Sequence, residues 1–253
     1  VLATVPLLKE KDLTGAQAGK NPHRFVKAKP LSAYSESFRE LQAALALSDV
    51  DNPPKSILIT SALPNEGKTT TAVSFATSLV RAGLNVVLVD ADLRRPSVQK
   101  MIGAERSEFD MIDFLTHSCT LDDALQTNPD GGFEYLATTR QPANPADLLA
   151  SDAMKDLLVK LRQRFDMVIV DSPPVLPVSD SKALSSQLDK VVFVVKWQDT
   201  PKTAAEQSVA KLRDFGADLA GIIFEQVDME KQTRYGYGDS TYYYGRYSDY
   251  YLS

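Results

Sequence analysis

Cysteine and histidine are scarce in this sequence, and their scarcity removes two kinds of site. The 253 residues contain one cysteine, Cys119, so no internal disulfide bond is possible, which fits a reducing compartment. The two histidines, His23 and His117, are isolated from each other in the sequence and give a zinc site little support. We expect both histidines in surface or loop positions.

Long apolar runs and a surplus of basic residues are also missing. No run approaches the ~20 apolar residues that a membrane-spanning helix needs. The formal net charge of −5 argues against a general nucleic-acid-binding surface. Because the first residue is Val1 rather than Met, we expect a piece of a longer protein, with any membrane anchor outside it.

Apolar residues make up 43% of the chain, which is enough for one substantial core. Short apolar runs predict buried strands at residues 57–59, 86–89, 168–170, 191–195 and 222–224. Between the strands, residues 32–47, 72–80, 154–161 and 203–215 show helical periodicity. Buried strands that alternate with helices predict an α/β fold, in which a mostly parallel sheet is covered by helices on both faces.

Residues 57–70 form the stretch with the clearest chemistry. Here an apolar strand is followed by Ala-Leu-Pro-Asn-Glu-Gly-Lys-Thr, which matches G-x-x-x-x-G-K-[ST] except that Ala62 replaces the first glycine. Loop amides and the dipole of the following helix attract phosphate, Lys68 would reach the β/γ-phosphates, and the Thr69 hydroxyl would bind Mg²⁺. The alternative is a chance meeting of a strand and a lysine-bearing helix. The predicted nucleotide-binding residues are Asn65, Glu66, Gly67, Lys68, Thr69 and Thr70.

Carboxylates follow two other predicted strands. Asp90 and Asp92 come after residues 86–89, and Asp171 comes after residues 168–170. Ligands bind at the carboxyl edge of a parallel sheet, so these groups, Lys68 and Thr69 are expected in one crevice. Oxygen ligands suit a hydrated Mg²⁺. The alternative is that the three aspartates cap helices or begin loops.

Eight of the ten tyrosines lie between residues 235 and 251, among Gly, Ser and Asp. Such a segment cannot bury a core, so we expect a disordered tail. Residues 1–31 mix Lys, Gly, Pro and Gln without periodicity and are predicted to be a linker or loosely held arm. The expected layout is a linker at 1–31, a nucleotide-binding domain at 32–234 and a tyrosine-cluster tail at 235–253.

Together, residues 62–69, 90–94 and 168–173 and the tyrosine tail resemble the cytoplasmic domain of bacterial tyrosine kinases, the BY-kinases of exopolysaccharide and capsule export. The resemblance runs from about residue 32 to the end of the chain, and residues 36–39 and 144–149 also share it. It implies a P-loop NTPase-like fold, the cofactors ATP and Mg²⁺, and autophosphorylation of the tail in trans within a ring oligomer. It further implies that oligomer assembly regulates polysaccharide synthesis and export.

The resemblance also implies roles for particular residues. Lys68 and Thr69 would hold phosphate and metal, Asp171 would be the Walker B metal ligand, and Asp90 and Asp92 would share metal binding and activation of the tyrosine hydroxyl. Glu36 and Arg39 would contact the neighbouring subunit of a homo-oligomer. The phosphate acceptors would be Tyr235, Tyr237, Tyr242, Tyr243, Tyr244, Tyr247, Tyr250 and Tyr251.

Partners and location follow from the same resemblance. It implies a membrane anchor or chain-length domain outside this fragment and a cognate tyrosine phosphatase. The net charge of −5 argues against nucleic acid among the partners. The protein would work at the cytoplasmic face of the bacterial inner membrane, and this part of it would itself be soluble.

The sequence departs from the family pattern at three places. Asn65 stands where the family usually has glycine, and Gln42 replaces the second arginine of the subunit-contact motif Glu-x-x-Arg-x-x-Arg. Glu225 and Gln226 stand where related ATPases often have an adenine-contacting asparagine, so no base contact is assigned. Arg94 and Arg95 are equally consistent with a phosphate contact and with an exposed arginine pair.

Two other functions compete with a kinase. A MinD/ParA-like ATPase switch would carry a signature lysine where this chain has Leu63, and it would have no use for a tyrosine tail. A non-catalytic nucleotide-binding regulator of polysaccharide assembly would not need all three aspartates. A sticky low-complexity extension is the alternative reading of the tail.

Overall fold

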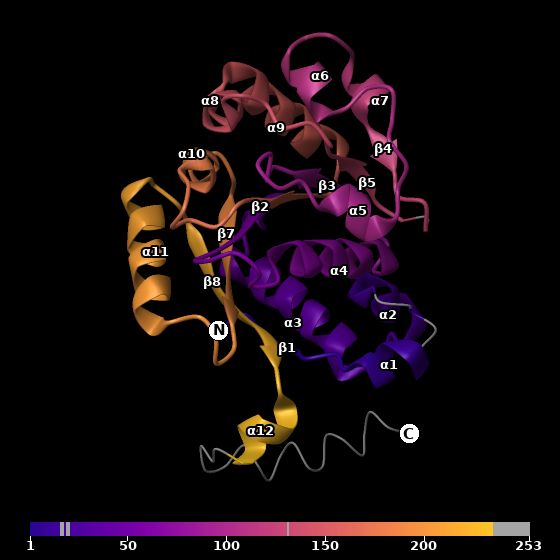
Figure 1. The fold of residues 1–253 in the computed structure, drawn as a ribbon, viewed down its shortest axis with the longest axis vertical. Coiled ribbons are helices and arrows are strands. Elements are labelled where there is room, and N and C mark those ends of the chain that lie inside the picture. The colour runs from indigo at the N-terminus through magenta and orange to yellow at the C-terminus, as the bar shows by residue number, and fades with distance from the viewer. Residues whose placement is uncertain (16–17, 19–20, 131, 235–253) are drawn as a thin grey trace.

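The computed structural model describes residues 1–15, 18, 21–130 and 132–234. Its strands are β1 (Ala3–Pro6), β2 (Ser56–Ser61), β3 (Val86–Asp90), β4 (Gln126–Thr127), β5 (Glu134–Leu136), β6 (Met167–Asp171), β7 (Lys190–Lys196) and β8 (Leu219–Val227). Within the described ranges they form one eight-stranded sheet in the order β1-β8-β7-β2-β6-β3-β5-β4. Every pairing is parallel except that of β4 with β5 (Figure 1).

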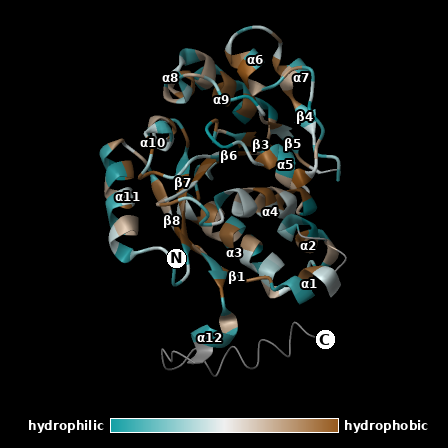
Figure 2. Cartoon of the chain, in the orientation of Figure 1, coloured by the Kyte–Doolittle hydropathy of each residue, from teal (hydrophilic) through white to brown (hydrophobic). Residues whose placement is uncertain are grey.

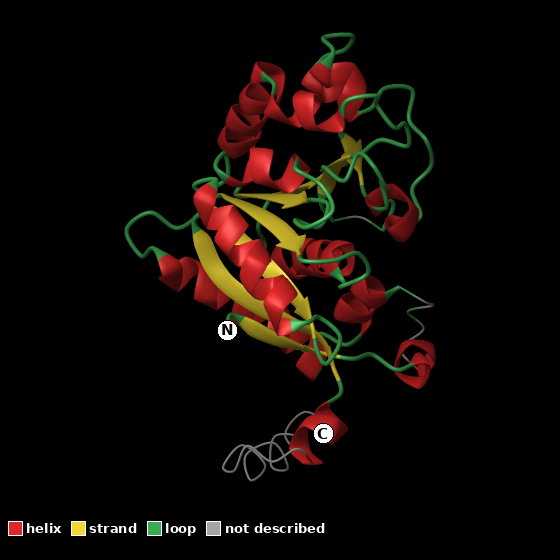
Figure 3. Cartoon of the chain, turned by 60° about the vertical axis from the view of Figure 1, so that its left-hand side comes forward, coloured by secondary structure: helices red, strands yellow, loops and turns green. Residues whose placement is uncertain are grey.

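Helices of very different lengths connect the strands. They are α1 (Glu10–Gly15), α2 (Pro22–Ala28), α3 (Ala33–Ser48), α4 (Lys68–Arg81), α5 (Val98–Ile102), α6 (Met111–Leu115), α7 (Leu121–Ala124), α8 (Pro145–Ala150), α9 (Asp152–Arg164), α10 (Asp180–Ser185), α11 (Lys202–Asp214) and α12 (Met229–Arg234). In Figure 3 helices lie on both sides of the yellow sheet. None of these helices combines the length and apolarity that a bilayer crossing requires.

Two apolar clusters, one on each face of the sheet, form the core. Ile57 and Ile59 of β2 join the cluster that contains α3 and α4, whereas Leu58 joins the cluster that contains α9 and α11. This alternation follows from the two-residue period of a strand. The helices in Figure 2 carry brown and teal bands, as expected for elements that bury one face. The predicted P-loop NTPase-like fold, with a mostly parallel sheet covered on both faces, is therefore confirmed.

The amino-terminal segment differs from the prediction of a linker. Residues Ala3–Pro6 form β1, which pairs with β8 and buries the side chains of Ala3 and Val5. Further along, α2 buries Phe25 and His23, so His23 is not the surface residue that we expected. A four-residue strand is too short to show periodicity, and the neighbouring Gly, Lys and Pro residues concealed it. The folded unit therefore begins at β1 rather than at residue 32.

The long elements lie where the sequence predicts them, and the short ones were missed. Helix α3 begins after Ser32, whose hydroxyl oxygen accepts a hydrogen bond from the Ser35 N–H, as expected for an N-cap. The middle of the chain contains β4 and β5, two short strands that are absent from the predicted strands. The predicted tail and its eight acceptor tyrosines lie outside the described residues.

Candidate active site

The loop between β2 and α4 takes the backbone conformation that a phosphate cradle needs. Asn65 has φ +63°, so asparagine adopts the left-handed conformation that glycine would otherwise supply. Gly67 has φ +95° and immediately precedes α4. A Cβ atom at Gly67 would lie 3.2 Å from Cγ of Glu225, so crowding as well as φ favours glycine here.

The Glu66 side chain braces this loop instead of facing a ligand. Its carboxylate is buried, and it accepts hydrogen bonds from the Leu63 N–H at 2.7 Å and from the Thr200 hydroxyl. Thr200 belongs to the connection between β7 and α11, so the carboxylate ties two loops together. Glu66 was predicted to bind nucleotide, but its side chain does not line the cavity described next.

A cavity of about 490 Å³ lies at the carboxyl edge of the sheet. Its lining consists of Pro64, Asn65, Gly67, Lys68, Thr69, Thr70, Asp92, Arg94, Arg95, Ser97, Met101, Pro173, Pro174, Pro177 and Val178. Lys68 is only 8% exposed, and none of the described residues forms a hydrogen bond or ion pair with its ammonium. Asp92 and Asp171 are close enough to interact with its charge. Lys68 therefore brings positive charge to the cavity that no described side chain neutralises directly.

Thr69 and Asp171 meet beside the cavity. The Thr69 hydroxyl donates to Oδ2 of Asp171 at 2.6 Å and lies 3.0 Å from the Ser97 hydroxyl oxygen. Oδ1 of Asp171 is buried without a hydrogen-bond partner among the described residues. Burial raises the pKa of Asp171, and the Thr69 hydrogen bond opposes the change. A buried carboxylate oxygen without a partner is a group that a bound cation would satisfy.

Asp90 and Asp92 occupy different environments although one residue separates them. Asp90 is fully buried, pairs in register with Asp171, and accepts hydrogen bonds from the N–H groups of Ser97, Val98 and Asp92 at 2.8, 2.9 and 3.2 Å. Burial and the nearby Asp171 charge raise the pKa of Asp90. Asp92 lines the cavity; burial raises its pKa, while backbone N–H groups and Lys68 oppose the change. Only Asp92 of these two carboxylates reaches the cavity surface.

The described residues contain no group of three or more His, Cys, Asp or Glu side chains that could hold a metal ion. Of the four predicted ligands, the structure brings Thr69 and Asp171 into contact, whereas backbone N–H groups occupy the oxygens of Asp90. Mg²⁺ in nucleotide sites is usually held by one or two carboxylates, phosphate oxygens and water. The Thr69 hydroxyl and the unpartnered Asp171 oxygen therefore fit a Mg²⁺ ion that arrives with a nucleotide.

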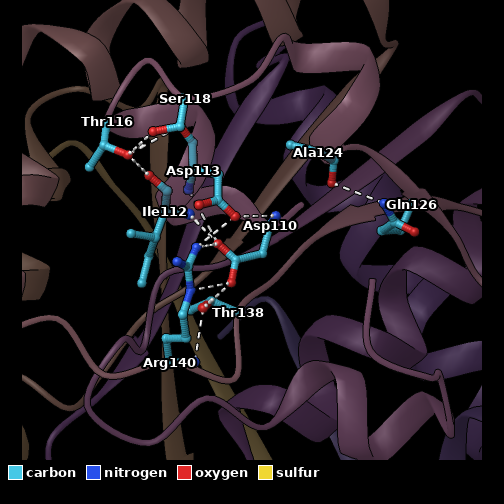
Figure 4. A network of polar contacts seen from close by, with 9 residues as sticks. All are labelled: Asp110, Ile112, Asp113, Thr116, Ser118, Ala124, Gln126, Thr138 and Arg140. Carbon is cyan, nitrogen blue, oxygen red and sulfur yellow. Dashed lines mark hydrogen bonds and ion pairs between the residues drawn. The ribbon is translucent and has the colours of Figure 1, made fainter. Parts of the chain in front are cut away.

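A polar network fixes the connection between β5 and α8 (Figure 4). Asp110 accepts from the Thr138 hydroxyl at 2.8 Å and from Nε and Nη2 of Arg140, and Arg140 also pairs with Asp113 at 2.7 Å. In the next position, the Gln141 amide donates to the Arg94 carbonyl at 2.8 Å. The network thus anchors a loop that touches a residue of the cavity lining.

Sequence reasoning gave no role to two buried acids next to this site. Glu225, at the end of β8, accepts from the Thr71 hydroxyl at 2.9 Å and from the Gln226 N–H at 2.8 Å, and burial raises its pKa to about 7. Asp180, in the first turn of α10, is fully buried against Arg94. No motif contains either residue, and each finds its partners only through the fold.

Comparisons with known proteins find relatives of this chain. Residues 55–217 match the AAA domain family. The chain is 34% identical over 208 residues to the tyrosine-protein kinase YwqD of Bacillus subtilis, which covers 82% of this chain and 87% of YwqD. It is 28% identical over 250 residues to the putative tyrosine-protein kinase EpsB of Ralstonia solanacearum, which covers 98% of this chain but only 33% of EpsB.

A solved structure of a tyrosine kinase domain has the same fold as this chain. The kinase domain of the Escherichia coli tyrosine kinase Etk superimposes on this chain with a TM-score of 0.84 and 27% sequence identity, covering 94% of both chains. The chain therefore spans most of YwqD and the Etk kinase domain, but about a third of the length of EpsB.

Proposed function

Because the chain belongs to the family of bacterial tyrosine kinases, we propose that it transfers the γ-phosphoryl group of ATP to protein tyrosine, with its own residues 235–251 as acceptors. The observation that carries the proposal is a cavity that combines a phosphate loop, the Thr69–Asp171 pair and an accessible Asp92. Phosphoryl transfer depends mainly on positioning and charge neutralisation, and these residues are suited to both.

The phosphate loop and Lys68 would bind the nucleotide phosphates. The amide groups of the loop and the amino-terminal end of α4 favour an anion, and the Lys68 ammonium adds a full charge. Thr69 and Asp171 would hold Mg²⁺, which neutralises charge on the phosphate oxygens when it is bound. The carboxylate of Glu66 stabilises the loop conformation through its hydrogen bonds with the Leu63 N–H and the Thr200 hydroxyl.

Asp92 is better placed than Asp90 to accept the proton of an acceptor tyrosine. Asp92 lines the cavity, whereas Asp90 is fully buried and its oxygens accept hydrogen bonds from three backbone N–H groups. A general base must come within hydrogen-bond reach of the proton that it takes. Asp90 would instead hold the start of α5 in place, and Pro173, Pro174 and Pro177 offer an apolar wall against which an aromatic ring can pack.

The cellular role that we propose is control of exopolysaccharide or capsule synthesis and export at the cytoplasmic face of the inner membrane. The motifs of the phosphate loop, the aspartates and the tyrosine tail support it, and the coverage of only a third of EpsB fits an anchoring part outside this chain. A cognate phosphatase would reset the tail. Glu36 and Arg39 form an exposed ion pair on α3, which is accessible for a subunit contact in a homo-oligomer.

Intact-mass spectrometry after incubation with Mg·ATP tests the proposed activity. The wild-type protein should gain several phosphate groups, and peptide mapping should place them on tyrosines of residues 235–251. Lys68→Met should gain none and keep its fold, while Lys202→Met, which changes an exposed lysine on α11, should behave as wild type. ATP hydrolysis without tyrosine phosphorylation in the wild-type protein would contradict the kinase and indicate an ATPase switch.

A further inference from the structure

Arg94 is held in the wall of the cavity by a fully buried carboxylate. Nε of Arg94 donates to Oδ2 of Asp180 at 2.8 Å and Nη2 donates to Oδ1 at 3.0 Å, so the guanidinium fork is engaged bidentately. The Asp180 side chain is 0% exposed, whereas that of Arg94 is 43% exposed. This geometry leaves one face of the ion pair sealed in the protein and the other open to the cavity.

The backbone of Arg94 is fixed as well. Its carbonyl accepts from the Gln141 amide at 2.8 Å, and the adjacent Arg140 is locked to Asp110. Asp180 accepts one hydrogen bond from Nε of Arg94 and one from Nη2, and none of the described residues accepts a hydrogen bond from Nη1. A guanidinium carries five N–H groups, so three remain available for an oxygen anion in the same cavity as Lys68 and Asp92.

A purely structural role does not require this arrangement. Replacing a buried ion pair by apolar residues is often neutral or stabilising, so a buried carboxylate is weak evidence for stability. A guanidinium held firmly in a cavity wall, by contrast, supplies pre-oriented donors that need no rearrangement when charge develops. Arg94 was one of two arginines that the sequence left open between a phosphate contact and an exposed pair, and Asp180 distinguishes it from Arg95.

We propose that Arg94 binds oxygens of the transferred phosphoryl group and that Asp180 is the positioning residue that orients Arg94. This inference rests on the proposed function. During transfer the bond from the γ-phosphorus to the ADP oxygen breaks, a bond to the tyrosine oxygen forms, and the hydroxyl proton passes to Asp92. Arg94 forms no covalent bond; its N–H groups donate to the phosphoryl oxygens, whose charge is shared among them in the transition state.

The test compares a ground-state probe with a transition-state probe. Affinity for Mg·ADP and for Mg·ADP with aluminium fluoride is measured in wild type, Arg94→Gln, Asp180→Asn and the double variant. Mg·ADP affinity should stay within about twofold, because Arg94 acts on the transferred group. The extra affinity given by aluminium fluoride should fall ~100-fold in Arg94→Gln. Asp180→Asn leaves the guanidinium of Arg94 charged but mobile, and in this variant the extra affinity given by aluminium fluoride should fall ~10-fold or more.

The double variant separates positioning from structure. If Asp180 acts only through Arg94, Arg94→Gln/Asp180→Asn should be no worse than Arg94→Gln, whereas independent effects would add. Tyrosine phosphorylation at saturating Mg·ATP should fall in the same order. Asp218→Asn, which breaks the ion pair of Asp218 with Lys190, should retain the wild-type values. Arg94→Gln leaves a buried carboxylate without a partner, so the double variant, which removes both charges, is decisive if the single variant does not fold.

The outcomes also separate this inference from the kinase itself. If the wild-type protein binds the aluminium fluoride complex but phosphorylates no tyrosine, the proposed kinase activity is wrong. The role of Arg94 is then still decided by the affinities of its variants for that complex. Unchanged aluminium fluoride affinity in Arg94→Gln overturns the inference even if the kinase is active. Additive losses in the double variant, or an equal loss of Mg·ADP affinity in every Arg94 and Asp180 variant, would show that the pair is structural.

Discussion

Replacing Glu225 by Gln should change the pH dependence of stability in a defined direction. Burial raises the pKa of Glu225 from its ordinary 4.5 to about 7 in the folded protein. A raised pKa means that the folded state binds the proton more tightly than the unfolded state does. The stabilisation by this group is therefore complete below pH 4.5 and is lost as the pH rises through about 7. At about 1.4 kcal/mol per pH unit, the loss amounts to roughly 3 kcal/mol.

Glutamine resembles the protonated acid at this position. Its amide oxygen can accept from the Gln226 N–H, and its NH₂ can donate to the Thr71 hydroxyl oxygen, which mirrors the two contacts of Glu225. The side chain keeps its length, so the space beside Gly67 of the phosphate loop stays filled as before. Glu225→Gln should thus be nearly neutral at pH 5 and stabilising by up to ~3 kcal/mol at pH 8.

Urea unfolding at pH 5, 6.5 and 8 measures this difference. Trp197 is the single tryptophan of the chain, and its backbone N–H donates to the Glu225 carbonyl at 3.0 Å, so its fluorescence reports on this region. Glu206→Gln, at an exposed position of α11, serves as the control and should show no growing advantage with pH. The same difference between Glu225→Gln and wild type at all three pH values would refute the reasoning.

Three further predictions concern the loop and the tail. Gly67→Ala should weaken Mg·ATP binding in calorimetry and destabilise the fold by ~1–2 kcal/mol, because alanine at φ +95° is strained; full affinity would contradict this. Deleting residues 235–253 should remove tyrosine phosphorylation and leave Mg·ATP affinity intact, and a loss of affinity would assign the tail to the fold. Phosphorylation adds roughly −1.5 to −2 charges per tyrosine to a chain with a net charge of −5, so copies of the phosphorylated protein should repel one another and sediment as smaller species than Lys68→Met. Equal masses would show that the charge of the tail does not control assembly.

The sheet and the phosphate loop could be predicted because their signals are local. Strands such as residues 168–170 are continuous apolar runs, and Gly67, Lys68 and Thr69 occur together in the chain. The rule that ligands bind at the carboxyl edge of a parallel sheet then brings Asp92 and Asp171 near Lys68 without any knowledge of side-chain positions.

The rest depends on contacts between distant parts of the chain. Asp90 and Asp92 look equivalent in the sequence, and only the fold shows that Asp92 lines the cavity whereas Asp90 is buried among three backbone N–H groups. Asp180 meets Arg94 across 86 positions, and Glu225 meets Thr71 across 154. The strand Ala3–Pro6 forms because the edge of β8 is available to it, and its own four residues carry too little signal.

The pairing of β1 with β8 has a consequence for contacts between copies of this chain. An unpaired strand edge invites another chain to add its own strand, and short edge strands and proline discourage such addition. Here β1 pairs with the second half of the long β8, has only four residues and ends at Pro6, while β4 at the opposite edge has two residues. The described sheet therefore offers little backbone for strand addition. Contact between copies is left to the side chains of helices and loops, and these are the groups whose interactions a change in charge can strengthen or weaken.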